Sequence, residues 1–185
     1  MWLSSGALSL ALLGDALIYI VLPVNAEAFG VGIAWVGILL AANRIVRTFS
    51  YGMIAVLGER IGIRDLCILA TVAAIISTAM YGLVAGWAAL LAARILWGVS
   101  YGALLLAALG YAATDRARTG SRVGVSRAIE QVGPLLALTV GAWLAGIVGP
   151  REVFLYLAIV SCIGAIFALK LPRRVAKPLT PRADR

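Results

Sequence analysis

The sequence predicts an all-α integral membrane protein with six transmembrane helices. Hydrophobic residues make up 63% of the 185 residues and charged residues only 13%, whereas soluble domains are about half apolar and about a quarter charged. Six apolar segments follow one another, and each is long enough to cross the hydrocarbon core of a bilayer at about 20 residues per crossing. Most basic residues gather beside two short loops and at the C-terminal end, the kind of bias that sets the orientation of membrane proteins.

The apolar segments place the six spans at 6–27, 32–57, 66–85, 88–113, 123–148 and 152–171. Two of the turns between them, 58–65 and 114–122, carry arginine clusters, whereas the other three hold a single basic residue, Arg151. Because basic loops stay on the cytoplasmic side, we expect both termini to face the cytoplasm. The proline-bearing basic segment 172–185 is expected to be a disordered cytoplasmic tail held near anionic lipid.

Several functional classes are disfavoured. The net charge of +8 raises nucleic-acid binding as an alternative, but positive charge at loops and tail does not form a basic groove, so we expect no nucleic-acid partner. The chain has no His and two separated cysteines, which disfavours a metal site. No phosphate-binding loop or dinucleotide fingerprint occurs, so we expect no cofactor. Residues 98–102 match the G-x-S-x-G nucleophile elbow of hydrolases, but they lie within a predicted helix and lack a His base, so the sequence predicts no enzyme.

Charged side chains inside the predicted spans are the candidate functional residues. They are Asp15, Arg44, Arg47, Arg94 and Glu130. A charge at the centre of a bilayer costs roughly 2.5–3.5 kcal/mol on insertion scales, so these groups should face the bundle interior or a water-filled cavity and should pair. Asp15 and Arg44 lie about ten or more residues from either end of their spans, which is near mid-membrane at about 1.5 Å per residue.

Asp15 and the second span are expected to form the central polar group. Arg44 and Arg47 are three residues apart and share a helix face, which Asn43 extends, and we expect Asp15 to pair with one of the two arginines. Two interpretations stay open: structural ion pairs that set helix register, or groups that line a translocation cavity or carry a coupling proton. Asp15 and Glu130 are the only carboxylates well inside the spans and are therefore the candidates for a proton site.

Glycines recur at four-residue spacing in and beside the spans. The pairs are Gly82 with Gly86, Gly98 with Gly102, and Gly120 with Gly124. Within a span this spacing allows the close approach of a neighbouring helix. We therefore expect the three pairs to be packing positions.

A longer motif lies between the second and third spans. Residues 55–64 read A-V-L-G-E-R-I-G-I-R, which resembles the G-x-L-A-D-R-x-G-R-[RK] signature of the major facilitator superfamily. Leu57, Arg60, Gly62 and Arg64 match, and Glu59 keeps the sign of the family's Asp. Gly62 permits the tight turn. In that resemblance the charged side chains form a cytoplasmic gate.

Two further motifs follow in the order expected for that family. Arg94 with Gly98 four residues later, and Gly102 beyond, resembles the fourth-helix pattern whose Arg is associated with proton coupling in efflux members. Gly133-Pro134 resembles the G-P pair of the antiporter motif, without its following glycines. The resemblance covers the chain up to about residue 171 as the N-terminal six-helix half of such a transporter.

The resemblance implies a fold and a function. The fold is two inverted three-helix repeats. The function is proton-coupled efflux of a small organic solute across a plasma membrane, specifically a bacterial inner membrane. The resemblance implies that Asp15, Asn43, Arg44 and Arg47 line the central cavity. It also implies that Arg94 and Glu130 tune protonation or hold the bundle together. These six residues form the expected substrate and proton pathway.

The superfamily transporter has two six-helix halves, and this chain supplies one. Three accounts stay open. The chain is a fragment or split product of a longer transporter, it works as a parallel homodimer or with a separate second half, or it is a structural or regulatory membrane subunit that transports nothing.

Overall fold

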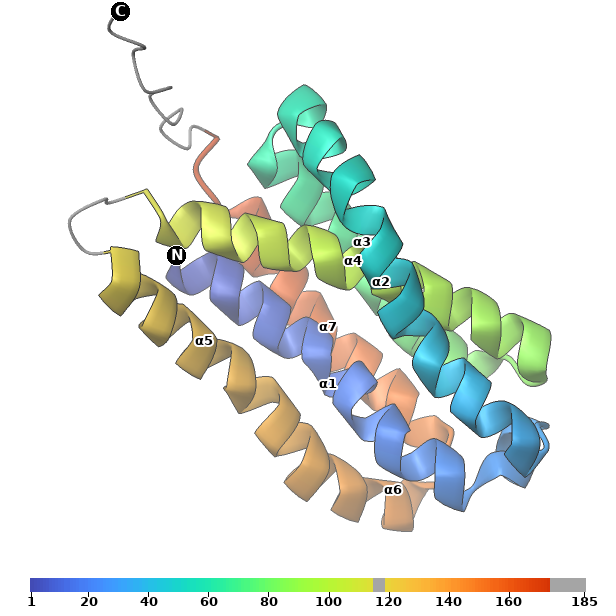
Figure 1. Ribbon diagram of the computed structural model, residues 1–185. Helices are drawn as coiled ribbons and strands as arrows, with labels where there is room; N and C mark the ends of the chain where they lie inside the picture. The colour runs from blue at the N-terminus through green and yellow to red at the C-terminus, as the bar shows by residue number, and fades with distance from the viewer. Residues whose placement is uncertain (115–118, 174–185) are drawn as a thin grey trace, which may run out of the picture.

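The computed structural model describes residues 1–114 and 119–173, and that part of the chain is helical apart from its turns. Six helical regions are long and apolar enough to cross a membrane, in agreement with the all-α fold predicted from sequence (Figure 1). The predicted loop 114–122 lies partly, and the predicted tail almost entirely, outside the described residues. The elements are α1 (Trp2–Val24), η1 (Ala26–Phe29), α2 (Ile33–Ile61), α3 (Ile63–Leu83), α4 (Trp87–Ala112), α5 (Thr119–Leu136), η3 (Ala137–Gly141), α6 (Ala142–Val148) and α7 (Glu152–Leu169).

The turn between α2 and α3 is much shorter than the loop predicted at 58–65. Helix α2 continues to Ile61 and α3 begins at Ile63, so Gly62 alone breaks the helix. Its φ of 90° and ψ of 150° are accessible to glycine and strongly disfavoured for other residues. The charged residues before it have good intrinsic helix propensity, which explains why polarity alone did not end the helix there.

The fifth span is a single helical path made of three pieces. Helix α5, the π-helical stretch η3 and α6 together cover Thr119–Val148. Pro134 lies inside α5, where its ring removes one backbone donor and crowds the carbonyl of the preceding turn. Short π-helical stretches within helices are frequent near functional sites. The apolar pattern of the sequence predicts the span but not this irregularity.

The helix contacts of the first half of the chain are repeated in the second half, with α1, α2 and α3 corresponding to α4, α5 and α7. Helix α2 packs on α4 as α5 packs on α1, and α3 packs on α4 as α7 packs on α1. Helices α3 and α7 also pack on each other, as do α1 and α4. This is the pattern expected of two three-helix repeats related by a twofold axis, with α1 equivalent to α4.

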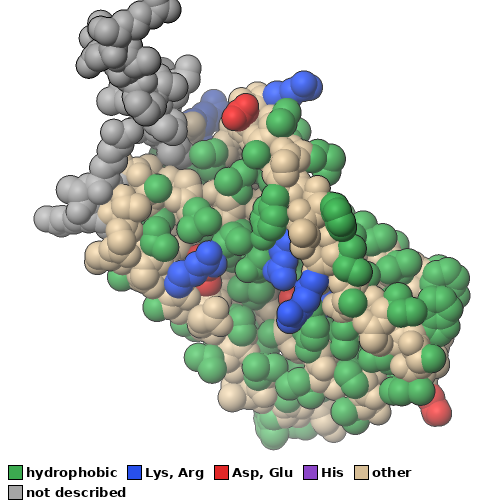
Figure 2. Space-filling model, viewed as in Figure 1, with side chains coloured by type: hydrophobic (Ala, Val, Ile, Leu, Met, Phe, Trp, Pro, Cys, Tyr) green, Lys and Arg blue, Asp and Glu red, His purple; other side chains and the backbone are tan. Residues whose placement is uncertain are grey.

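Helix α1 is central and the fifth span is peripheral. In its most apolar stretch, 56% of α1 is buried, compared with 17% for the fifth span. Figure 1 shows α1 between α5, α7 and α4, with α2 on the side away from α5. Apolar side chains cover much of the outer surface (Figure 2). Such a surface suits lipid rather than water. Polar side chains from different helices meet instead in the interior, between α1, α2 and α4.

Candidate functional site

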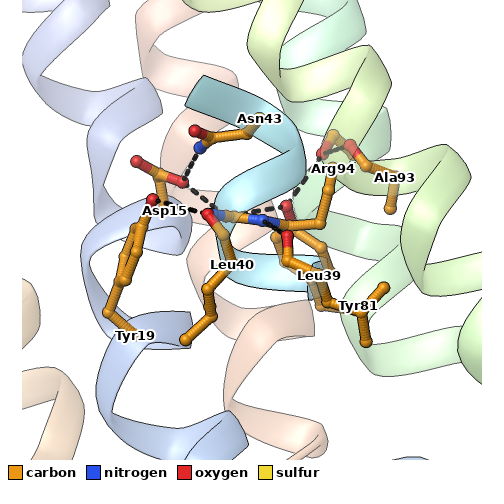
Figure 3. A network of polar contacts seen from close by, with 9 residues as sticks. Asp15, Tyr19, Leu39, Leu40, Asn43, Tyr81, Ala93 and Arg94 are labelled. Atoms are coloured by element: carbon orange, nitrogen blue, oxygen red, sulfur yellow. Dashed lines mark hydrogen bonds and ion pairs between the residues drawn. The ribbon is translucent and has the colours of Figure 1, made fainter. Parts of the chain in front are cut away.

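A buried ion pair joins the first and fourth spans. Arg94 Nη1 donates to Asp15 Oδ1 over 2.6 Å, and the side chains are 1% and 13% exposed. Figure 3 shows the two side chains meeting between α1 and α4, beside α2. A guanidinium so fully removed from solvent needs a counter-charge and further acceptors to offset the loss of its hydration. Asp15 supplies that charge.

Three helices satisfy the donors of Arg94. Its Nε donates to the Leu39 carbonyl over 3.1 Å and its Nη2 to the Leu40 carbonyl over 3.3 Å. Its Nη1 also lies 3.5 Å from the Tyr81 hydroxyl. The guanidinium is planar and rigid, so these contacts fix its position relative to α1, α2 and α3 together (Figure 3).

Asn43 completes the group around Asp15. Its Nδ2 donates to Asp15 Oδ1 over 3.0 Å. Gly98 makes this possible, because a Cβ at that position would lie 2.7 Å from the Asn43 backbone carbonyl. Four residues later, a Cβ at Gly102 would lie 2.8 Å from Cδ1 of Ile54. Both glycines therefore let α2 pack against α4, as expected from their spacing.

Arg44 and Arg47 lie elsewhere than expected. Within the described residues neither has an ion-pair partner, and Asp15 pairs with Arg94 instead. The guanidinium of Arg44 lies 5.8 Å from the centre of the Tyr19 ring, and that of Arg47 lies 4.2 Å from the Tyr101 ring. The expectation of an Asp15 pair with α2 was wrong because equal depth does not determine which face of α2 turns inward. Asn43 takes the inner position, whereas Arg44 is exposed and Arg47 half-buried.

Glu130 belongs to a separate cluster between α1 and α5. Its Oε2 accepts from Arg127 over 2.9 Å, and its Oε1 accepts from the Ser126 hydroxyl over 3.0 Å. Ser126 in turn shares a 2.7 Å hydrogen bond with Ser5 of α1. Glu130 is 3% exposed and Arg127 45% exposed, so the cluster reaches from the α1–α5 interface to the surface. The structure does not bring Glu130 into the Asp15 group.

Gly133 is a point of close approach between α1 and α5. A Cβ there would collide with the backbone carbonyl of Ser9. The Gly133 amide donates to the Ser9 hydroxyl over 2.8 Å, and Pro134 follows directly. Of the predicted pair Gly82 and Gly86, a Cβ at Gly82 would lie 2.9 Å from the Leu155 side chain of α7, whereas one at Gly86 would meet nothing within 4 Å. The predicted pair Gly120 and Gly124 does not pack: a Cβ at either position would meet nothing within 4 Å. That expectation was wrong because this part of α5 turns those positions away from α1.

The motif between α2 and α3 is mostly exposed. Leu57, Glu59 and Arg60 are exposed, and neither charged side chain has an ion-pair partner in the part of the chain described. Arg64 instead donates to the carbonyls of Leu169 and Leu171, each over 2.8 Å. Its charge thereby satisfies free acceptors at the end of α7. The motif holds α3 to α7 and leaves Glu59 and Arg60 available for contacts beyond this chain.

Tyr81 and Tyr101 were not predicted as site residues. Tyr81 is 1% exposed, and its hydroxyl accepts a long 3.5 Å contact from Ser77, which also bonds the Ala93 carbonyl over 2.8 Å. The available signal was the Ser77–Tyr81 spacing of four, which puts two hydroxyls on one buried face of α3. Tyr101 carried no comparable signal, because its role depends on where α2 places Arg47.

These features define a multi-pass membrane protein whose helices enclose an ionised pair within the membrane-spanning region. The chain belongs to the Major Facilitator Superfamily, whose sequence model matches residues 5–185. It is therefore a member of a family of membrane transporters, as the three motifs predicted. No curated protein sequence matches this chain.

Proposed function

We propose that this chain is one half of a proton-coupled secondary transporter that exports a small organic solute across a plasma membrane, specifically a bacterial inner membrane. The observation that carries the proposal is the Asp15–Arg94 pair inside the membrane-spanning helices. Ionisable groups at such depth mark substrate or proton pathways in membrane proteins. Membership of the family supports transport in general, and the Asp15–Arg94 pair supports coupling of that transport to protons.

Asp15 suits a proton site because of its depth and its free oxygen. It lies about 20 Å along α1 from Trp2 and about 14 Å from Val24, at about 1.5 Å per residue. Its Oδ1 accepts the hydrogen bonds from Asn43 and Arg94, and its Oδ2 has no hydrogen-bond partner among the described residues. With 13% of the side chain exposed, a proton can reach Oδ2 without first breaking the contact to Arg94.

Protonation would loosen one interface and spare others. A proton on Asp15 cancels its charge, which leaves Arg94 held by neutral acceptors on α2 and α3. The attraction between α1 and α4 then falls, whereas α4 stays attached to α2 and α3. A bound proton thus favours arrangements in which α1 shifts relative to those helices, which is how a ligand with different affinity for two states moves the equilibrium between them.

The second half of the transporter would come from elsewhere. A second copy in parallel orientation, a separate chain or a further segment of a longer protein can each supply it, with substrate bound between the halves. The exposed Glu59 and Arg60 on the turn side of α2 would contact that half as a gate. Glu130 with Arg127 would hold the α1–α5 interface during the movement.

Flux in proteoliposomes tests the proposal. The purified chain is reconstituted, a pH gradient is imposed, and uptake is measured for three labelled solutes of equal shape: 2-naphthoate, 2-naphthamide and 2-naphthylmethylamine. We expect gradient-driven flux of one of them, with Asp15→Asn abolishing it but sparing exchange of that solute without a gradient. Glu27→Gln is the control, since Glu27 is exposed at η1, away from the pair. Equal gradient-driven flux in Asp15→Asn and the unsubstituted protein would refute proton coupling through this residue.

A further inference from the structure

The central part of α2 carries two positive charges that the described chain does not neutralise. Arg47 is the middle residue of α2, equally far from Ile33 and Ile61, and Arg44 lies one turn before it. Neither has an ion-pair partner in residues 1–114 or 119–173. Asp15 forms its ion pair with Arg94, at 2.6 Å, and not with either of them.

The two guanidiniums are oriented by aromatic rings. Arg47 lies 4.2 Å from the centre of the Tyr101 ring on α4, and Arg44 lies 5.8 Å from the Tyr19 ring on α1. A ring attracts a guanidinium through its face. It accepts no hydrogen bond in the guanidinium plane, so the N–H edges stay free for a bidentate acceptor. The rings therefore position both arginines, and the Tyr19 side chain also hydrogen-bonds Arg44. No carboxylate engages either guanidinium within the described residues.

Both arginines lie on a face that other molecules can reach. Arg44 is exposed and Arg47 half-buried. Figure 2 shows Lys and Arg side chains in the middle of the face that α1, α2 and α5 present, with small parts of acidic side chains beside them and apolar side chains around them. Two like charges about one turn apart repel each other. They also lie on a helix long enough to span a membrane, where a charge without a partner is costly. An anion between them would reduce both the repulsion and this cost.

We propose that Arg44 and Arg47, with Tyr19 and Tyr101 behind them, form the binding site for a small organic carboxylate, which is the solute that the transporter carries. This rests on the proposed transport function and adds the charge class of its substrate. The planar guanidinium edges match the two oxygens of a carboxylate. The surrounding apolar side chains suit the organic part of the solute and disfavour strongly hydrated inorganic ions.

Arginine labelling tests binding without requiring transport. The full chain is reconstituted in phosphatidylcholine vesicles, whose headgroups carry no net charge, and is treated with phenylglyoxal before peptide mass spectrometry. Exposed Arg60 should label in every sample, and Arg94, which is 1% exposed, should not. We expect 2-naphthoate or succinate to reduce labelling of Arg44 and Arg47 at least fivefold, and 2-naphthamide and 2-naphthylmethylamine to have no effect. Protection without any added anion would show that protein carboxylates already occupy the site and would overturn the proposal, as would failure of both anions to protect.

Substitutions give a second readout. Arg44→Gln and Arg47→Gln should each weaken binding of 2-naphthoate at least tenfold, and the matched lysine variants should recover part of that loss. Lys170→Gln removes one exposed positive charge at the end of α7 and should leave binding unchanged. Equal losses in Lys170→Gln and the arginine variants would overturn the site.

The two proposals fail in different ways. Flux of 2-naphthylmethylamine in place of 2-naphthoate would keep the transport function and overturn the carboxylate site. Charge-selective binding of 2-naphthoate without flux of any of the three solutes would keep the site and overturn transport by this chain alone.

Discussion

Gly133 offers the sharpest test of how α1 and α5 pack. In Gly133→Ala the new methyl group would occupy the space of the Ser9 carbonyl. Backbone cannot rotate away as a side chain can, so α1 and α5 must separate. That movement stretches two contacts between the same helices: the Gly133 amide to the Ser9 hydroxyl, at 2.8 Å, and the Ser5–Ser126 hydroxyl pair, at 2.7 Å.

The cost follows from three contributions. Overpacking of a close interface costs about 1–3 kcal/mol. Each of the two stretched hydrogen bonds contributes about 1 kcal/mol. Replacing glycine by alanine within a helix returns about 1 kcal/mol. Gly133→Ala should therefore lower the free energy of unfolding by about 2–4 kcal/mol, a large share of the marginal stability of a small protein.

Gly124 provides the matched control on the same helix. A Cβ there would meet nothing within 4 Å, so Gly124→Ala gains helix propensity without a clash and should stabilise by up to about 1 kcal/mol. The assay is reversible unfolding of the purified protein in mixed micelles with increasing sodium dodecyl sulfate, followed by helical circular dichroism. Equal unfolding midpoints for the two variants would refute the packing described for α1 and α5.

The remaining predictions concern the other helix contacts. Gly98→Ala should destabilise the protein by about 1–3 kcal/mol, because its methyl group meets the backbone of α2. Gly37→Ala, with open space around it, should change the stability by no more than about 1 kcal/mol. Equal effects of the two substitutions in the same unfolding assay would contradict the close approach of α2 to α4. Arg64→Gln should speed amide hydrogen exchange in the last turn of α7, since the last carbonyls of that helix lose a charged donor; unchanged exchange would show that the contact does not hold α7. Asp15→Asn and Arg94→Gln should each destabilise by about 3–5 kcal/mol, and the double variant by at least about 1 kcal/mol less than their sum; strict additivity would mean that the pair is not energetically coupled.

The sequence predicts the fold well because lipid imposes a simple rule. A chain that crosses a bilayer must satisfy its backbone internally, so long apolar segments become helices. What the apolar pattern does not encode is irregularity within a helix. The π-helical stretch Ala137–Gly141 consists of residues that fit an ordinary helix equally well. It follows Pro134, whose presence predicts a distortion but not its form. The early end assigned to the second span had the opposite cause: polar residues were taken as a loop, although only Gly62 adopts a non-helical conformation.

The structure brings three of the predicted residues together, Asp15, Asn43 and Arg94, but with other contacts than the sequence predicted. Asp15, Asn43 and Arg94 are candidates because polar and charged side chains are costly inside a membrane-spanning helix and are usually functional there. Their pairing depends on how each helix is rotated, which the sequence encodes only through weak differences between faces. Arg94 lies between Ala93 and Trp97 on the buried face of α4. That surrounding was the available sign that it, and not Arg44, turns toward α1.

The two kinds of arginine in the bundle can now be assigned different tasks. Arg94 is enclosed and balanced, with acceptors on α1, α2 and α3, so any change at Asp15 is felt by several helices at once. Arg44 is exposed, Arg47 is half-buried, and neither has an ion-pair partner within the described chain, so in the proposed site they would bind the solute. Tyr19 connects the two groups, because its ring lies 4.9 Å from the guanidinium of Arg94 and 5.8 Å from that of Arg44. An anion drawn to Arg44 would weaken the pull of that guanidinium on Tyr19, one turn from Asp15 on the same helix. Solute and proton would thus both act on contacts of a single aromatic ring, which is a short physical route for coupling one to the other.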